Sequence, residues 1–129
     1  MPVELNHTIV AARDRQVSAE FLAHILGLTV GPAWGHFLPV STANGVTLDF
    51  VTVGDEPIAS QHYAFLVSDE EFEAAFGRIR AAGIGFWADP GRKQPGQINH
   101  SHGGRGVYFL DPSGHFLEVL TRPYGSGGA

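Results

Sequence analysis

The sequence predicts an α+β fold in which one arrangement, strand–helix–strand–strand–strand, occurs twice in tandem. Stretches rich in β-branched and aromatic residues alternate with two segments in which apolar residues recur at helical spacing. The order of these stretches is the same in both halves of the chain, which indicates an internal repeat. With 129 residues, of which 43% are hydrophobic and 16% charged, the chain is long enough for one domain made of two small modules.

The first predicted module covers residues 1–53 and opens with a strand at residues 3–11. A helix follows over residues 16–26, where apolar side chains recur at intervals of three and four. Asp14 is a suitable cap for the start of this helix, and Gly27 suits the left-handed residue that commonly ends one.

Three short strands complete the first module, at residues 28–30, 35–41 and 46–53. The pair Asn44-Gly45 lies between the last two of them. Because both central positions of a type I′ turn need a positive φ, this pair predicts a tight hairpin of that type.

The second predicted module covers residues 61–122, after a linker at residues 54–60. Its first strand lies at residues 61–67, and Ser68 and Glu71 fit a capping box at the start of a helix. The apolar stripe of this helix consists of Phe72, Phe76 and Ile79. The helix is predicted to end at Gly83.

Three strands are also predicted after the second helix. An Asp-Pro-Ser-Gly turn at residues 111–114 joins the last two of these strands. The Pro- and Gly-rich segment 89–106 is predicted to form an elaborated loop. The tail at residues 123–129 is expected to be flexible. The strands lie at residues 84–88, 106–110 and 116–121.

Composition excludes several classes of function. The formal net charge of −5 argues against nucleic acid as a partner, because phosphate binding needs a clustered positive surface. The absence of Cys excludes disulfides and thiol chemistry. No apolar stretch is long enough to span a bilayer and no secretory signal is visible, so we expect a cytoplasmic protein without a membrane partner.

The repeat places four chemically active side chains in equivalent positions. His7 corresponds to His62 and Asp49 to Glu118, and loop 89–106 accounts for the longer interval in the second half. If the modules pair about a pseudo-two-fold axis, two imidazoles and two carboxylates meet across one groove. Such a donor set suits Fe, Mn, Ni, Co or Zn, so the repeat predicts a divalent metal site.

The segment Gly106-Val-Tyr-Phe-Leu-Asp-Pro-Ser-Gly-His-Phe-Leu-Glu118 resembles the vicinal oxygen chelate superfamily, and the resemblance extends over residues 3–122. This superfamily includes glyoxalase I, extradiol dioxygenases, fosfomycin-resistance transferases and bleomycin-binding proteins. The resemblance implies two βαβββ modules that form a cupped mixed sheet around a shared cavity. It also implies a metal bound by His7, His62 and Glu118, which holds two vicinal oxygens of a substrate.

The resemblance also suggests catalytic residues. The pattern that precedes the last ligand in ring-cleaving dioxygenases can be matched with His100 and Tyr108, although His102 lies only two residues from the first of these. Asp49 falls where glyoxalase I carries a fourth, glutamate ligand, but it is one methylene shorter. Fosfomycin transferases place a basic residue where this chain has Gly127.

Aromatic and basic side chains are candidates for binding the substrate. Four aromatic residues would stack on a flat ligand if they line the groove, although each would serve equally well in a core. Two arginines in loop 89–106 would attract an anionic or oxygen-rich molecule if the loop closes over the site. These candidates are Trp34, Phe37, Tyr63, Trp87, Arg92 and Arg105.

Together these features predict a metal-dependent enzyme that acts on a small oxygen-rich molecule, as an isomerase/lyase or as an extradiol-dioxygenase-like oxidoreductase. The alternative is a non-enzymatic, bleomycin-resistance-like protein that sequesters an antibiotic or another natural product. Because such a chain contributes only small half-cups, the resemblance further implies a homodimer.

Overall fold

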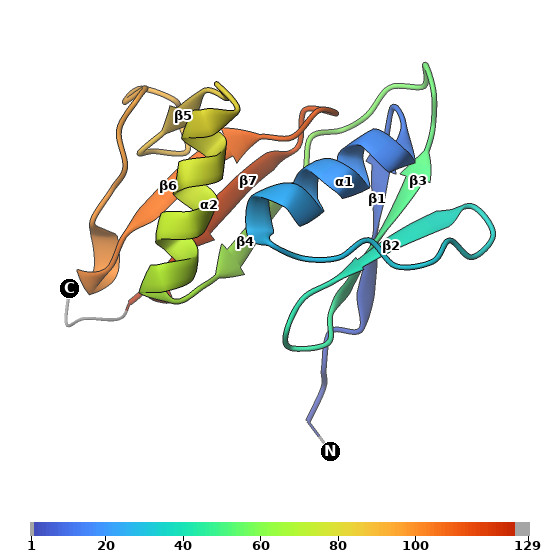
Figure 1. Cartoon of the computed structure of the whole chain (residues 1–129), viewed down its shortest axis with the longest axis horizontal. Coiled ribbons are helices and arrows are strands. Elements are labelled where there is room, and N and C mark those ends of the chain that lie inside the picture. The colour runs from blue at the N-terminus through green and yellow to red at the C-terminus, as the bar shows by residue number, and fades with distance from the viewer. Residues whose placement is uncertain (1, 126–129) are drawn as a thin grey trace. The chain divides into compact units, whose positions relative to one another are not determined.

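A computed structural model describes residues 2–125 of the chain (Figure 1). The chain divides after Ile58 into two compact units, called here the N-terminal and the C-terminal unit. Each contains one α-helix and one mixed sheet, so the predicted α+β class is confirmed. No helix in the described part of the chain is long and apolar enough to cross a membrane.

The N-terminal unit contains a three-stranded mixed sheet in the order β1-β3-β2. Strands β1 and β3 are parallel, and β2 is antiparallel to β3. In chain order the elements are β1 (His7–Ala12), α1 (Arg15–Leu26), β2 (Phe37–Ser41) and β3 (Thr47–Thr52).

Both predicted ends of α1 are confirmed. The side chain of Asp14 accepts hydrogen bonds from the backbone N–H groups of Gln16 at 2.9 Å and Val17 at 3.3 Å. Gly27 has φ of 69°, the left-handed conformation that a side chain disfavours. The buried residues Leu22 and Ile25 lie on the inward face of the helix.

Two predictions about the N-terminal unit are wrong. Residues 28–30 form no strand, because only Val30 bridges to Val40. The hairpin turn is not type I′, since among its residues only Gly45 has a positive φ, of 84°. The Thr42 N–H donates to the Val46 carbonyl at 2.8 Å, which leaves three residues in the loop, and loops of that length use a type I turn followed by one left-handed residue.

The C-terminal unit contains a four-stranded mixed sheet in the order β4-β7-β6-β5. Strands β4 and β7 are parallel, whereas β6 is antiparallel to both β7 and β5. In chain order the elements are β4 (His62–Leu66), α2 (Asp69–Ala81), β5 (Phe86–Trp87), the short 3₁₀ helix η1 (Ser101–Gly103), β6 (Gly106–Leu110) and β7 (Phe116–Leu120).

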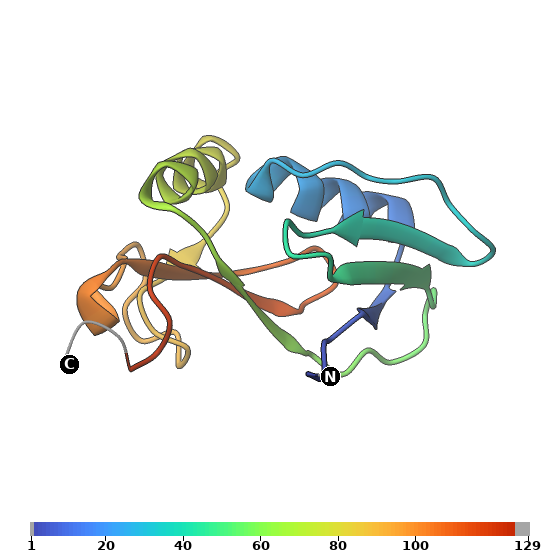
Figure 2. The ribbon, with the colours of Figure 1, turned by 90° about the horizontal axis from the view of Figure 1, so that it is seen from below.

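Helix α2 covers one face of this sheet, as two perpendicular views show (Figures 1 and 2). The predicted capping box is present, with the Glu71 N–H donating to the Ser68 hydroxyl and the Ser68 N–H donating to the Glu71 carboxylate. The core under the helix consists of fully buried apolar side chains, among them Phe72, Ile79, Val107, Phe109 and Val119. The opposite face of the sheet is therefore free to carry a site.

Strand β5 is shorter than predicted. The Ile84 N–H completes the end of α2 by donating to the Ile79 carbonyl at 3.2 Å, and the Ala88 N–H donates into the following loop at 3.1 Å, to the Gln94 carbonyl. Only residues 86 and 87 remain to pair with β6.

The two units share one register around their candidate ligands. In the N-terminal unit His7 pairs with Thr47, two residues before Asp49, and in the C-terminal unit His62 pairs with Phe116, two residues before Glu118. The sequence repeat therefore corresponds to a repeat in strand pairing.

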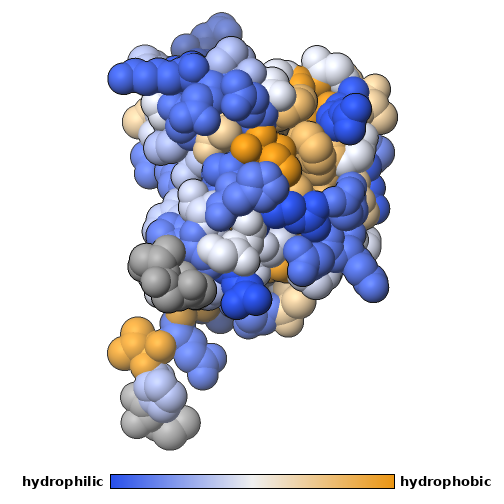
Figure 3. All heavy atoms as spheres, turned by 90° about the vertical axis from the view of Figure 1, so that its left-hand side faces the viewer, coloured by the Kyte–Doolittle hydropathy of each residue, from blue (hydrophilic) through white to orange (hydrophobic). Residues whose placement is uncertain are grey.

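The polar side chains lie mostly at the surface. Figure 3 shows a largely hydrophilic face with small hydrophobic patches between the polar groups.

We predict that Phe72→Ala lowers the free energy of unfolding by about 3–5 kcal/mol, because Phe72 is fully buried between α2 and its sheet. Leu66→Ala, at an exposed position of the same unit, should change that free energy by no more than about 0.5 kcal/mol. Urea denaturation of both variants measures the difference. Equal losses would show that α2 does not form the core of this unit.

Candidate functional site

The candidate site lies on the face of the C-terminal sheet that α2 leaves free. Side chains alternate between the faces of a strand, so Phe116 and Glu118 of β7 point to the same side. Tyr108 on β6 lies directly opposite Glu118, and Trp87 on β5 lies opposite Tyr108. His62 on β4 lies opposite Phe116. The free face therefore carries one carboxylate among aromatic and imidazole rings.

Glu118 is 2% exposed and has polar partners on both carboxylate oxygens. The Tyr124 hydroxyl donates to them, with its oxygen 2.7 Å from Oε1 and 2.8 Å from Oε2. Because that single proton is directed at Glu118, the Tyr108 hydroxyl, 3.2 Å from the Tyr124 hydroxyl, must be the donor of the pair. The two phenols thus form a chain of donors that ends on the carboxylate.

His62 approaches the same carboxylate with a defined nitrogen. Its Nδ1 lies 2.9 Å from the carbonyl oxygen of Phe116, which can only accept, so Nδ1 carries a proton. Its Nε2 lies 3.1 Å from Oε1 of Glu118. In a neutral imidazole this Nε2 would be an acceptor facing another acceptor. The contact is therefore favourable only with a proton or a metal ion between the two atoms.

The His62–Glu118 pair fits a divalent transition metal. Bonds of about 2.1 Å at right angles separate two ligand atoms by about 3.0 Å, close to the 3.1 Å found between Nε2 and Oε1. Imidazole nitrogen and carboxylate oxygen are also the ligand types that such ions take. Among the residues that the structure describes, no three His, Asp or Glu side chains are grouped to hold a metal.

The surroundings keep both phenols in their donor form. Burial is the main reason that the pKa of Tyr108 lies well above its ordinary value, and the hydrogen bond with Tyr124 raises it further. Burial also raises the pKa of Tyr124, and the neighbouring Glu118 carboxylate acts in the same direction. Both hydroxyls are therefore protonated at neutral pH and available to donate.

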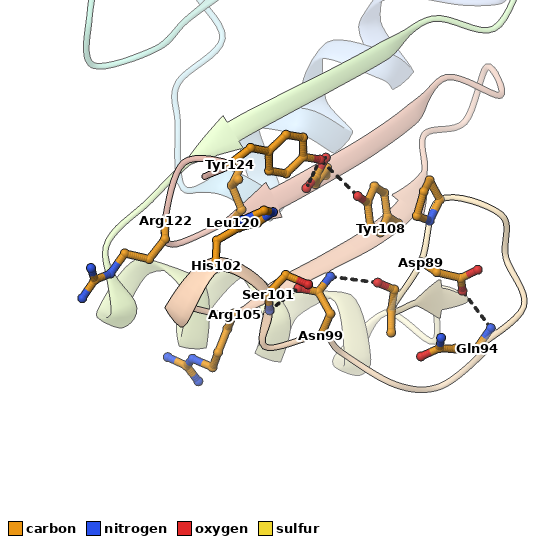
Figure 4. A pocket seen from close by; sticks show the side chains of 13 residues that line it. Asp89, Gln94, Asn99, Ser101, His102, Arg105, Tyr108, Leu120, Arg122 and Tyr124 are labelled. Carbon is orange, nitrogen blue, oxygen red and sulfur yellow. Dashed lines mark hydrogen bonds between the residues drawn. The ribbon is translucent and has the colours of Figure 1, made fainter. Parts of the chain in front are cut away.

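A pocket of about 390 Å³ opens beside this carboxylate (Figure 4). Its polar lining includes His102, whose Nδ1 accepts a hydrogen bond from the Gly125 N–H at 2.9 Å. The lining residues, all in the C-terminal unit, are Ala88, Asp89, Pro90, Gln94, Asn99, Ser101, His102, Arg105, Tyr108, Glu118, Leu120, Arg122 and Tyr124.

Loop 89–106 is held in place by hydrogen bonds to its own backbone and to Ala88, the residue that follows β5. The Asp89 carboxylate accepts from the N–H groups of Lys93 and Gln94, and the Asn99 side chain donates to the Ala88 carbonyl at 2.8 Å. At Gly104 an added Cβ would lie 2.5 Å from the Thr121 hydroxyl oxygen, so only glycine allows the loop to pack so closely on the chain after β7.

The two predicted arginines have different surroundings. The Arg92 guanidinium lies over the rings of Trp87 at 5.8 Å and Phe116 at 5.7 Å, on the face that carries Glu118. Arg105 instead pairs with the Asp69 and Glu73 carboxylates of α2. Its side chain extends away from the Tyr108–Tyr124 pair (Figure 4). The two carboxylates of α2 neutralise its charge.

His100, predicted as catalytic, is exposed and is not part of the pocket lining. The neighbouring His102 occupies the lining because its own φ of 57° reverses the chain at η1. Tyr63, on the other sheet face by strand parity, packs its ring edge against the ring of His115 at 6.1 Å.

The remaining candidates lie in the N-terminal unit. His7 is exposed, and its Nδ1 donates to the Asn6 side-chain oxygen at 2.7 Å, which leaves Nε2 free to bind a metal. Asp49 is 5% exposed, and its Oδ1 has no hydrogen-bond partner among the described residues. Trp34 and Phe37 pack on each other at 5.2 Å, with Trp34 largely exposed.

Tyr124, which contacts Glu118 from beyond the last strand, is absent from the residues that the sequence predicts for the site. It lies in a Pro- and Gly-containing segment without periodicity, so no sequence pattern marks it as part of the site. Gly127, which entered the comparison with fosfomycin transferases, lies outside the described residues.

Several known proteins are similar to this chain in sequence or structure. The solved structure named "Oxidase ChaP-H2" is 61% identical, covers 99% of this chain and 100% of its own, and superposes with a TM-score of 0.96. "Oxidase ChaP-H1" is 58% identical, covers 97% and 100%, and has a TM-score of 0.93. "Glutathione transferase FosA" of Serratia marcescens is 35% identical over 122 residues, which make up 89% of this chain and 78% of that protein.

The family model for the Glyoxalase/Bleomycin resistance protein/Dioxygenase superfamily matches residues 4–119, nearly the whole chain. This match covers both sheets, both helices and the segment that ends in the buried carboxylate Glu118. The chain therefore belongs to this superfamily, whose members are the vicinal oxygen chelate proteins.

Proposed function

We propose that this protein is a divalent-metal-dependent enzyme that oxidises a small, oxygen-rich molecule. The observation that carries the proposal is the His62–Glu118 contact, in which a buried carboxyl group and an imidazole with a protonated Nδ1 face each other at a distance that suits a shared metal ion. The homologues named as oxidases and transferases support enzymatic activity rather than simple sequestration.

The proposed metal ligands are His7, His62 and Glu118. His7 is included because it holds in the first repeat the position that His62 holds in the second, and its Nε2 is likewise left free by a donating Nδ1. Two imidazoles and one carboxylate leave positions open for a chelating substrate. The bound ion, one of Fe, Mn, Ni, Co or Zn, would stabilise negative charge on the substrate oxygens.

The protein's own groups would orient the substrate at this face. Trp87 and Phe116, with Arg92 over both rings, offer a cationic and aromatic surface to an aromatic or anionic molecule. Tyr108 and His102 line the pocket beside Glu118 and can hydrogen-bond the bound molecule. Tyr108 would keep the role that the sequence suggests for it, and His102 would take the role suggested for His100. Asp49, buried with an unpaired oxygen, is the candidate base of the first repeat.

An oxidation that uses dioxygen is favoured over an isomerisation or a thiol transfer. The support for this choice is the likeness to two proteins named as oxidases, at 61% and 58% identity, compared with 35% for the glutathione transferase. Of the reactions that the sequence left open, the extradiol-dioxygenase-like one is therefore the one we propose.

We predict that the protein, purified without a chelator or a metal-affinity column, contains about one equivalent of a divalent transition metal. His62→Ala and Glu118→Ala should each lose it, because each removes a ligand. His24→Ala, an exposed histidine of α1, should keep it. Elemental analysis with circular dichroism of all four proteins makes the measurement, and unchanged metal content in a folded His62→Ala protein would refute the assignment.

We predict that the Fe²⁺-loaded protein consumes dioxygen when catechol or 2,3-dihydroxynaphthalene is added, and that Glu118→Ala does so no faster than free Fe²⁺. An oxygen electrode measures the uptake. If uptake is absent with both probes while the Ni²⁺- or Zn²⁺-loaded protein isomerises a thiohemiacetal, the isomerase reading replaces the oxidase one. A protein that holds no metal even after reloading would favour the alternative function, a non-enzymatic protein that sequesters a small molecule.

We predict a homodimer in solution, as the superfamily resemblance implies. Light scattering coupled to gel filtration should give twice the mass of the chain at micromolar concentration. A mass equal to that of one chain over the same range would contradict this prediction.

A further inference from the structure

We propose that Tyr124 is a positioning residue that holds the Glu118 carboxylate so that a single oxygen, Oε1, faces His62 and the bound metal. This inference rests on the metal site of the proposed function. It assigns a role to the segment that follows the last strand, in which no functional residue was predicted.

The contacts of Tyr124 converge on the carboxylate. Its hydroxyl oxygen lies 2.7 and 2.8 Å from the two oxygens of Glu118, while Nε2 of His62 contacts Oε1 alone, at 3.1 Å. When Oε1 binds a cation on the His62 side, the Tyr124 hydroxyl retains Oε2 as its acceptor. A carboxylate whose second oxygen receives a hydrogen bond is a poorer bidentate ligand, so more positions at the metal remain open to the substrate.

The segment that carries Tyr124 is tied to the rest of the unit on both sides of it. Before it, Thr121 exchanges two hydrogen bonds of 2.9 Å with the backbone of Arg105. After it, the Gly125 N–H donates to Nδ1 of His102, and the ring of Tyr124 packs on the ring of His102 at 5.0 Å. The hydroxyl is therefore delivered to Glu118 by a fixed stretch of chain.

The side chain of Tyr124 contributes little to the core. The residue is 62% exposed, so its ring remains largely in water while its hydroxyl reaches a carboxylate that is 2% exposed. Removal of the hydroxyl alone should therefore leave the fold intact and change only the surroundings of Glu118.

The test compares metal affinity in the parent and in Tyr124→Phe. Competition with a chromophoric chelator should show Zn²⁺ and Co²⁺ bound about 10- to 100-fold more weakly by the variant, the usual cost of losing a hydrogen bond to a ligand. The visible absorption of the Co²⁺-loaded protein should also change in intensity, because a carboxylate released from Tyr124 can bind through both oxygens. A purely structural role for Tyr124 would move neither value.

Two further variants serve as controls. Tyr63→Phe removes a phenol hydroxyl from the other face of the same sheet, so its Zn²⁺ affinity and Co²⁺ spectrum should match those of the parent. Tyr108→Phe removes a hydroxyl whose stronger hydrogen-bond partner is Tyr124 and whose weaker partner is Glu118, so its loss of affinity should be smaller than that of Tyr124→Phe. Circular dichroism confirms that each variant is folded.

The possible results are distinct. Equal affinities and equal Co²⁺ spectra for the parent and Tyr124→Phe would overturn the role of Tyr124 while leaving the metal site in place. Tighter binding by Tyr124→Phe would also overturn it, because the hydroxyl would then compete with the metal for the carboxylate. If the parent and Glu118→Ala bind Zn²⁺ equally weakly, the proposed metal site itself fails, and the role of Tyr124 fails with it.

Discussion

The buried carboxylate of Glu118 determines much of the arrangement around it. Moving a negative charge out of water costs several kcal/mol unless hydrogen bonds or an opposite charge offset it. Tyr124, Tyr108 and His62, which come from three separate segments of the C-terminal unit, are all directed toward this one group. The Phe116 carbonyl fixes the His62 tautomer, so backbone, imidazole and phenols form one connected network. Helix α2, by packing on the other face of the sheet, leaves this face to the network.

The N-terminal repeat has the same strand register but different surroundings for its acid. Asp49 is paired on β3 as Glu118 is on β7, yet one of its buried oxygens has no partner among the described residues. The difference follows from the neighbours, since Tyr108 lies opposite Glu118 whereas Pro39, which offers no donor, lies opposite Asp49. The two repeats thus share one strand register, although their sheets differ in strand number and their acids differ in surroundings.

The sequence was a good guide wherever a local rule determines the structure. Asp14, Gly27 and the Ser68–Glu71 capping box were located correctly because helix ends depend on backbone groups a few residues away. Strands β6 and β7 were also located to within a residue, because alternation and the intervening turn define them. The repeat singles out His62 and Glu118, and the structure brings these two side chains into contact. Local rules were insufficient for the Asn44-Gly45 turn, whose type depends on the length of the loop.

Residues placed by long-range contacts were not predictable. Tyr124 reaches Glu118 only because the chain after β7 packs on Gly104 and His102, and His102 rather than His100 lines the pocket because of one left-handed residue. Arg105 resembled a substrate ligand in a basic loop, but Asp69 and Glu73, one turn apart on α2, neutralise it. In each case the deciding partner is far away in the sequence.

The most direct test of this account is a two-bond ¹H–¹⁵N NMR spectrum of the histidine rings, recorded before and after one equivalent of Zn²⁺ is added. Nδ1 of His62 should carry a proton in both states, while the Nε2 resonance should move on metal binding. The proposed metal site would be contradicted by a His62 ring whose Nδ1 lacks a proton, or by a His62 spectrum that does not respond to Zn²⁺.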